Sequence, residues 1–259
     1  TAMIKVEIKK TETGPETYNL TLKPFSIVFM GTPEFAVASL DALLAAGLHV
    51  VGVITAPDKP GGRGMQLQQS AVKKYAVEHN LSVLQPVKLK DPLFIEQLKS
   101  LGADLQIVVA FRMLPEIIWD MPRMGTLNLH GSLLPQYRGA APINWAVING
   151  EKETGVTIFK LQHEIDTGNI LLQKSFPIEY TDNAGDVHDK MKEIGAELLV
   201  EAVKAMIKGT LTEKPQSEYD VSALKSAPKI FKEDCQLDFS KTAIENYNFI
   251  RGLSPYPTA

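Results

Sequence analysis

The sequence is poor in the residues and runs on which several classes of protein depend. Its one cysteine, Cys235, cannot form an internal disulfide, which suits a reducing cytoplasm. Asp234 and Gln236 flank this cysteine and offer no activating cation, so we expect a packing or surface role for it. The longest hydrophobic runs, such as 50–54 and 105–111, have the length of strands and are too short to span a membrane. We therefore expect no membrane partner.

Positive charge is not in excess either. The chain has 27 lysines and arginines against 30 acidic residues, a net charge of -3. Such a chain has no bulk attraction for nucleic acid or anionic lipid. A polyanionic partner would have to be held by local basic residues.

Three familiar site motifs are also missing. Gly31-Thr32-Pro33 follows the first predicted strand but lacks the further glycines of a dinucleotide fingerprint, which argues against a nicotinamide cofactor. The histidines have no HxxxH or cysteine partner spacing, so we expect no metal site, and only His163, near Asp166, is kept as a candidate. Ser132 is not part of a GxSxG elbow, which argues against a serine hydrolase.

What the sequence contains is an alternation of apolar strands and amphipathic helices. Strands are predicted over 26–30, 49–55, 82–84, 105–110, 154–160 and 170–178, and helices over 34–46, 70–79, 92–101, 142–149, 183–207 and 242–250. This alternation predicts an α/β fold with a mostly parallel sheet. Thr32 is expected to cap the first helix. Apolar and polar residues alternate at the start of the stretch 3–24, and the rest of that stretch is mostly polar. This pattern predicts an extension with one short edge strand.

The most informative run is NLHGSLLPQYRGAAP, residues 128–142, directly after an apolar strand. Open α/β sheets bind their ligands at such strand ends. An imidazole, His130, two residues from the amide of Asn128 predicts proton transfer and stabilisation of an oxyanion. A strand end with a hydrogen-bonded histidine explains the same residues.

Three other loops have two interpretations each. The helix start after Gly31 could donate backbone NH groups to a ligand or could be a plain cap. The loop 57–64 carries Lys59 and Arg63, which could bind phosphate or be solvated. Asp166, before Thr-Gly, could orient His130 or form an ordinary turn.

Taken in order, the motifs resemble a known family. The runs FMGTPEFAV (29–37), PDKPGGRG (57–64), 128–142 and DTG (166–168) closely resemble the methionyl-tRNA formyltransferases, a branch of the folate-dependent formyltransferases. The resemblance runs from Phe25 to the end of the chain. It implies a Rossmann-like enzyme that moves a formyl group from 10-formyltetrahydrofolate to the α-amine of methionine on initiator methionyl-tRNA, for translation initiation. It also implies an extension 1–24, a catalytic domain 25–211, a linker 212–231 and, in 232–259, the truncated start of a C-terminal domain, with weak tRNA binding as a result.

The resemblance also implies a role for individual residues. Asn128, His130 and Asp166 form a catalytic trio, with Asn128 at the oxyanion, helped by His130, and Asp166 orienting His130 and aiding proton removal. Folate contacts are implied for Ser132, Leu133, Leu134, Pro135, Arg112, Met113 and Leu114. Contacts with the methionyl-tRNA are implied for Gly31, Thr32, Arg63 and Lys59.

The sequence departs from the family near the 57–64 loop. Met65 and Gln66 stand where lysines are common, and Ala71 replaces a usual proline. Fewer positive charges mean fewer phosphate contacts and a shallower salt dependence.

Other functions remain open at this point. The acceptor could be a sugar-nucleotide amine or glycinamide ribonucleotide, although the 57–64 loop and the chain beyond Lys229 favour tRNA. A formyltetrahydrofolate hydrolase or a catalytically silent folate-binding module would carry a similar fold.

Overall fold

A seven-stranded sheet forms the centre of the protein, in a computed structural model that describes residues 2–9, 17–61, 66–219 and 222–259. Its strand order is β12-β11-β9-β8-β3-β4-β7. The parallel strands are β3 (Ser26–Gly31), β4 (His49–Ile54), β7 (Val83–Leu84), β8 (Leu105–Val109) and β9 (Thr126–His130). The strands β11 (Glu153–Lys160) and β12 (Ile170–Pro177) are antiparallel to their neighbours. The predicted mostly parallel α/β fold is confirmed.

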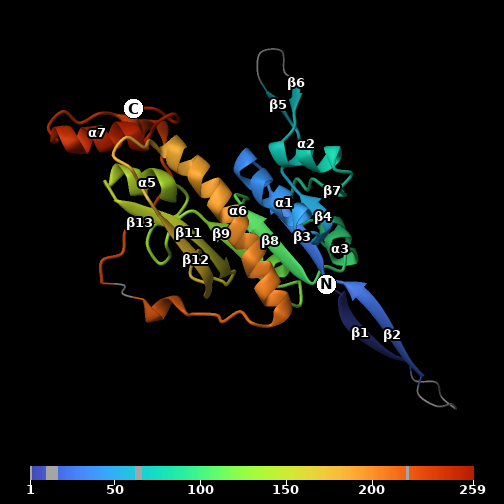
Figure 1. Ribbon diagram of the computed structural model, residues 1–259. Coiled ribbons are helices and arrows are strands. Elements are labelled where there is room, and N and C mark those ends of the chain that lie inside the picture. The colour runs from blue at the N-terminus through green and yellow to red at the C-terminus, as the bar shows by residue number, and fades with distance from the viewer. Residues whose placement is uncertain (1, 10–16, 62–65, 220–221) are drawn as a thin grey trace.

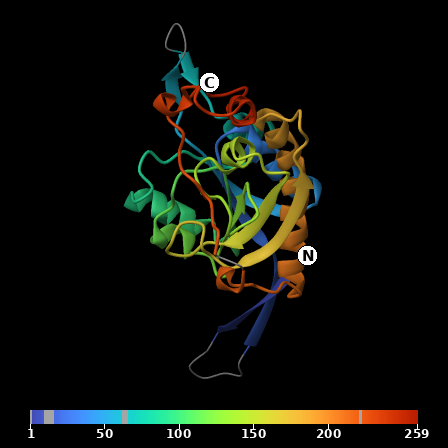
Figure 2. The same ribbon diagram turned by 90° about the vertical axis from the view of Figure 1, so that its left-hand side faces the viewer.

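Helices cover both faces of this sheet (Figures 1 and 2). One face packs against α1 (Glu34–Ala45), α2 (Ala71–Glu78), α5 (Pro142–Ile148) and α6 (Ala184–Lys208), and the other against α3 (Pro92–Ser100) and α4 (Glu116–Trp119). The central strand β3 shows why both faces are needed. Ile27 and Phe29 enter the first core while Val28 and Met30 enter the second, and all four are fully buried.

Capping residues set the ends of the long helix α6. The Asn183 side chain accepts hydrogen bonds from the backbone NH groups of Gly185 and Asp186, and Gly209 ends the helix with a φ of 68°. At α1 the expectation was wrong. Pro33, with extended backbone, occupies the N-cap position and no side chain caps the helix, so Thr32 does not have that role.

The N-terminal region contains two strands rather than the one that was expected. β1 (Ala2–Lys9) and β2 (Thr17–Pro24) pair with each other in antiparallel register and form their own two-stranded sheet. The expected edge strand is wrong, because neither strand pairs with the seven-stranded sheet. A second small hairpin, β5 (Lys59–Gly61) with β6 (Gln66–Gln68), rises beside α2 (Figure 1).

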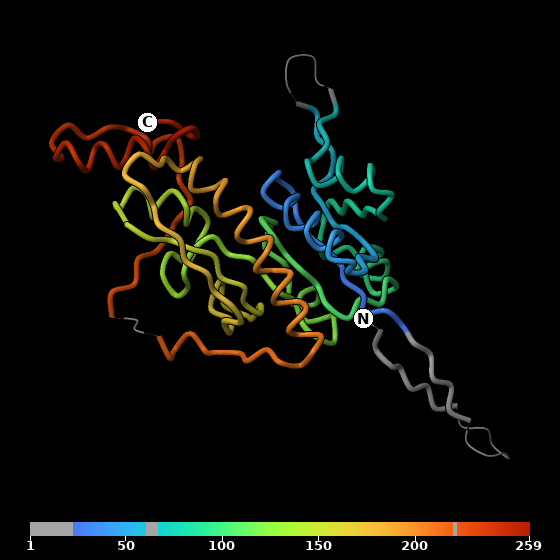
Figure 3. The backbone as a smooth tube through the Cα atoms, viewed as in Figure 1, coloured from blue at the N-terminus to red at the C-terminus, as the bar shows by residue number. Residues whose placement is uncertain are grey.

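After α6 the chain runs back along the molecule before it reaches the last helix, as the tube in Figure 3 shows. Within this segment β13 (Ser226–Ala227) pairs in parallel with β10 (Arg138–Gly139). One-turn 3₁₀ helices stand at Gln216–Glu218 and Lys232–Cys235. The last helix, α7 (Ala243–Gly252), packs on α5, where the Asn144 amide donates to the Gly252 carbonyl at 2.8 Å. None of the helices in the described part of the chain is long and apolar enough to cross a membrane.

Candidate active site

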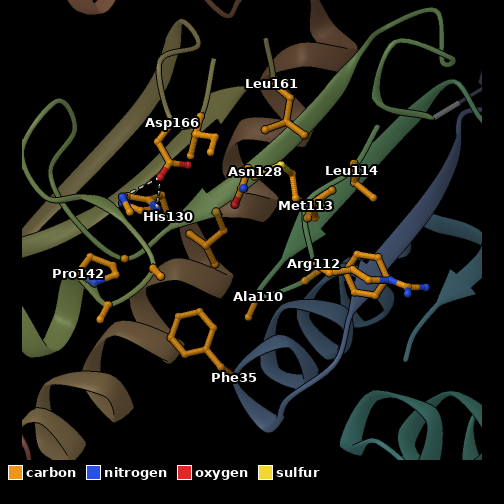
Figure 4. A pocket seen from close by; sticks show the side chains of 18 of the residues that line it. Phe35, Ala110, Arg112, Met113, Leu114, Asn128, His130, Pro142, Leu161 and Asp166 are labelled. Atoms are coloured by element: carbon orange, nitrogen blue, oxygen red, sulfur yellow. Dashed lines mark hydrogen bonds and ion pairs between the residues drawn. The ribbon is translucent and has the colours of Figure 1, made fainter. Parts of the chain in front are cut away.

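A cavity of about 700 Å³ opens at the carboxyl ends of β3, β8 and β9. The chain leaves β3 in one direction to build β4 and β7 and in the other to build β8 and β9, so the strand order reverses beside β3. Open α/β sheets bind their ligands outside such a reversal. The main contributors to the wall are Pro33, Phe35, Ala110–Leu114, Asn128–Gly131, Gly139–Asn144, Leu161–Asp166 and His188 (Figure 4).

His130 ends β9 and lines this cavity, and its two ring nitrogens have different partners. Its Nε2 atom lies 3.0 Å from the backbone carbonyl oxygen of Tyr137. A carbonyl can only accept, so Nε2 carries the hydrogen in the neutral ring and Nδ1 has the free lone pair. That Nδ1 atom lies 3.8 Å from Asp166 Oδ2, and both side chains are about nine-tenths buried. His130 can therefore take up a proton at Nδ1 beside a carboxylate that stabilises the resulting charge.

Asp166 is fixed by its backbone as well as by its carboxylate. Oδ2 accepts a hydrogen bond of 3.0 Å from the backbone NH of Gly139, and the residue has a φ of 55°, in the left-handed region. Gly168, two residues on, approaches β11 so closely that a Cβ atom would lie 1.7 Å from the Lys160 carbonyl oxygen. The Asp-Thr-Gly sequence thus fits one close turn against the sheet.

Asn128 lies on the same strand as His130 and two residues before it, so both side chains point to the same face of the sheet. It is half-buried and lines the cavity. Figure 4 shows its amide in the same cavity as His130 and Asp166. The structure therefore brings together the three residues predicted to be catalytic, although Asn128 and Asp166 are 38 positions apart in the sequence.

The predicted folate residues divide into two groups. Arg112, Met113 and Leu114 line the cavity, and Met113 is 74% exposed at its rim. The Arg112 guanidinium donates to the backbone carbonyls of Pro86 and Val87, the second at 2.9 Å, and burial lowers its pKa. Arg112 thus links the loop that follows β8 to the loop that contains Pro86 and Val87.

Ser132, Leu133, Leu134 and Pro135 are not among the residues that line the cavity. Ser132 is fully buried and its Oγ donates to the Gln136 carbonyl at 2.6 Å. Leu134 is 1% exposed, and its backbone NH donates to Thr157 Oγ1 at 3.0 Å. The segment 132–135 therefore lies behind the wall, held by hydrogen bonds to β11, and supports the loop that carries Tyr137.

The residues predicted to contact the acceptor are also dispersed. Gly31 and Thr32 do not line the cavity, although Pro33 and Phe35 just after them do. A Cβ atom on Gly31 would lie 2.6 Å from Ala36, so close packing against α1 explains this glycine. Lys59 is exposed on β5, and Arg63 lies outside the described residues.

Three further residues contribute to the cavity although no role was predicted for them. Phe35 of α1 and His188 of α6 contact each other with ring centroids 5.1 Å apart, and Ile143 stands at the start of α5. His188 and Ile143 resemble ordinary helix residues in the sequence, whereas Phe35 belongs to the FMGTPEFAV run. His163 lies at the rim, where its Nε2 is 2.9 Å from Glu116 Oε1, and it is 74% exposed. In the described residues no group of three or more histidine, cysteine or acidic side chains is placed to hold a metal ion.

Comparison with known proteins adds to this geometry. The formyl transferase family model matches residues 25–203. Methionyl-tRNA formyltransferase of Bacteroides fragilis is 59% identical over 234 residues, which are 90% of this chain and 72% of that protein. The enzyme of the same name from Parabacteroides distasonis is 60% identical over 236 residues, 90% of this chain and 73% of that protein. The chain belongs to the methionyl-tRNA formyltransferase family.

Solved structures share the fold of this member of the methionyl-tRNA formyltransferase family. An N-formyltransferase from Helicobacter canadensis, in complex with folinic acid and dTDP-3-aminofucose, matches with a TM-score of 0.67 and 24% identity over 87% of this chain and 79% of its own. HypX from Aquifex aeolicus, in complex with tetrahydrofolic acid, matches with a TM-score of 0.65 and 19% identity over 89% of this chain and 34% of its own. At these identities the likeness shows the fold.

Proposed function

We propose that this chain transfers the formyl group of 10-formyltetrahydrofolate to the α-amine of methionine on initiator methionyl-tRNA. The observation that carries the proposal is the pairing of His130 with Asp166 in the cavity wall, where His130 Nδ1 lies 3.8 Å from Asp166 Oδ2 while Nε2 is bound to the Tyr137 carbonyl. The cavity has the size of a small-molecule site and an apolar wall with a few polar groups, which suits a folate. Because the acceptor belongs to translation initiation, we place the reaction in the cytoplasm.

In the proposed reaction, the amine nitrogen bonds to the formyl carbon and the bond from that carbon to folate N10 breaks. The amine loses one proton and N10 gains one, so the exchange is balanced. His130 takes the proton from the amine at Nδ1, and the Asp166 carboxylate stabilises the imidazolium. The Asn128 amide donates to the oxygen of the formyl group, on which negative charge develops.

The acceptor and the folate occupy different parts of the cavity in this proposal. The loop after β8, with Arg112, Met113 and Leu114, receives the folate, and His130, Asp166 and Pro142 lie on the other side of Asn128 (Figure 4). We assign that side to the acceptor, because His130, the proposed proton acceptor, lies there. Lys59 on β5, together with Arg63, which lies outside the described residues, would contact tRNA phosphates.

The test compares formyl transfer with formate release. Purified protein is incubated with 10-formyltetrahydrofolate and methionyl initiator tRNA, and formylmethionyl-tRNA and formate are both measured. We expect formylated tRNA in wild type and a loss on the order of 10²-fold or more in His130→Ala. Formate without formylated tRNA would identify a hydrolase, and folate binding without either product would identify a silent binding module. Transfer to a sugar-nucleotide amine or to glycinamide ribonucleotide, but not to tRNA, would also overturn the proposal.

A further inference from the structure

Gln216 joins the loop that carries Asp166 to the loop of Arg138, which follows His130 in the chain. It stands in the segment 212–231 that follows α6, and it is 4% exposed. Its Nε2 atom donates to the backbone carbonyls of Asp166 at 2.8 Å and Gly168 at 2.9 Å. Its Oε1 atom accepts from Arg138 Nε at 3.1 Å and Nη2 at 2.5 Å. One buried amide thus holds both loops.

These contacts act on the backbone that places the Asp166 carboxylate. Asp166 is a non-glycine residue with positive φ, a conformation that costs energy unless the surroundings hold it. Gln216 donates hydrogen bonds to the first and last carbonyls of the Asp166-Thr167-Gly168 turn. On the other loop, Arg138 directly precedes Gly139, whose NH donates to Asp166 Oδ2. The side chain of Gln216 therefore fixes both the carboxylate and its hydrogen-bond donor.

The same segment attaches to the His130 side of the cavity further along. The backbone NH of Tyr137 donates to the Lys225 carbonyl at 2.7 Å, and Ala227 accepts from Ala141 at 3.1 Å. β13 pairs with β10 between these two contacts. Tyr137 is the residue whose carbonyl holds His130 Nε2. Residues 216–219 and 222–227 thus contact both the turn that carries Asp166 and the loop whose Tyr137 carbonyl binds His130.

The formyl transferase family model matches residues 25–203 and stops before this segment. We propose that Gln216 is a positioning residue for the transfer reaction, which holds the Asp166 turn against the Arg138 loop so that the carboxylate faces His130 Nδ1. This inference rests on the proposed function. It adds that a residue beyond position 203, where the family match ends, helps to hold the candidate active site in place.

The test uses Gln216→Met, which keeps the size of the side chain and removes the hydrogen bonds. Asn246→Leu is the matched control, because the Asn246 amide, in α7 and outside the cavity wall, also donates to two backbone carbonyls, those of Asp238 and Lys241. We expect kcat of Gln216→Met to fall about 10- to 100-fold, since small displacements of reacting groups have effects of this size. The KM for 10-formyltetrahydrofolate should change less than about 3-fold, and Asn246→Leu should keep the wild-type kcat.

A double-mutant cycle separates positioning from a general loss of stability. If Gln216 acts through Asp166, Gln216→Met should cost less than about 2-fold when added to Asp166→Asn, measured in single turnovers. An equal loss in both backgrounds would overturn the inference, as would a kcat of Gln216→Met within 2-fold of wild type.

Hydrogen–deuterium exchange gives a readout that needs no activity. The segment 161–169 should exchange faster in Gln216→Met and at the wild-type rate in Asn246→Leu. Unchanged exchange in Gln216→Met would overturn the inference. A wild-type protein that transfers no formyl group would refute the proposed function instead, and the exchange result would still decide whether Gln216 holds the loop.

Discussion

The phenol oxygen of Tyr137 lies 2.5 Å from Glu151 Oε1, while the backbone carbonyl of the same tyrosine lies 3.0 Å from His130 Nε2. Lys225 Nζ also donates a hydrogen bond of 2.6 Å to Glu151 Oε1. Burial, with the bond to Glu151, raises the pKa of Tyr137, so its hydroxyl stays a donor across the working pH range. The hydrogen bonds among Tyr137, Glu151 and Lys225 thus hold the Tyr137 backbone in place. Its carbonyl binds His130 Nε2 and so leaves Nδ1 as the nitrogen that can accept a proton.

Tyr137→Phe is therefore expected to lower both stability and activity. It leaves a half-buried carboxylate without one donor, which costs about 1–3 kcal/mol in the free energy of unfolding. The kcat should fall several-fold because the Tyr137 carbonyl is held less firmly. Urea unfolding and steady-state kinetics measure the two effects. Tyr75→Phe is the control, since that phenol also lies 2.5 Å from a carboxylate, Asp41, but away from the cavity; an equal loss of kcat there would contradict the explanation.

Asn128→Ala should remove the proposed donor to the formyl oxygen. We expect kcat to fall on the order of 10²- to 10³-fold, the usual effect of losing one oxyanion donor. The KM for 10-formyltetrahydrofolate should stay within about 3-fold, because the charge develops only in the transition state. A near-normal kcat would remove Asn128 from the mechanism.

Gly168→Ala tests how closely the Asp166 turn must approach the sheet. The new Cβ would meet the Lys160 carbonyl oxygen at 1.7 Å, so the backbone must move and carry Asp166 with it. We expect a loss of kcat on the order of 10²-fold, with a lower Tm. Gly209→Ala is the control, because its φ of 68° brings strain but no atom lies within 4 Å of the added methyl group. That variant should lose about 1 kcal/mol of stability and keep its kcat.

Asp182 makes stability depend on pH in the acid range. Burial raises the pKa of this carboxyl, but hydrogen bonds from Lys190 Nζ at 2.6 Å and from the Glu179 backbone at 2.8 Å outweigh it, and the net pKa is lowered. A lowered folded-state pKa gives stability that is fully present above the unfolded value, about 3.9, and is lost as pH falls through the folded value.

Wild type should therefore be more stable than Asp182→Asn by a constant amount between about pH 5 and pH 8, and the difference should shrink below about pH 4. Urea unfolding across this range measures it. Asp120→Asn, at an exposed position, is the control and should show no comparable trend. A difference that grows as pH falls would contradict the assignment.

Lys59→Gln tests the hairpin beside α2 as a tRNA contact. Losing one phosphate contact should weaken binding of methionyl-tRNA modestly and lower the slope of log K against log salt by about 0.7 to 0.9. Lys208→Gln, at the far end of α6 from this hairpin, should leave the slope unchanged (Figure 1). Equal slopes for wild type and Lys59→Gln would exclude that contact.

Much of the fold could be predicted because its signals are local. The apolar run of β3 and the helical periodicity of 183–207 belong to short stretches of sequence, and α6 begins and ends one residue from the predicted bounds. The cap at Thr32 was wrong because the extended backbone of Pro33 already starts α1. The single edge strand was wrong because pairing between β1 and β2 is a relation between two segments, which alternation alone does not specify.

The candidate site was only partly visible for the same reason. Asn128 and His130 share one strand, so their spacing could be interpreted directly, whereas Asp166 reaches His130 only through the turn against Lys160. The segment 132–135 gave a strong motif, but a motif does not tell whether it lines a cavity or supports its wall. Gln216 gave no signal, because it lies in a polar, irregular stretch where neither periodicity nor a motif marks it.

The contacts of Gln216 and Ala227 with the loops beside the cavity bear on how this protein could be recombined with its relatives. A chimera that joined residues 25–203 to another C-terminal segment would keep the sheet and His130, yet it would exchange the amide at position 216 and the strand β13. Domain swaps for engineering should therefore place the crossover after Ala227, so that catalytic loops and the segment that fastens them are inherited together.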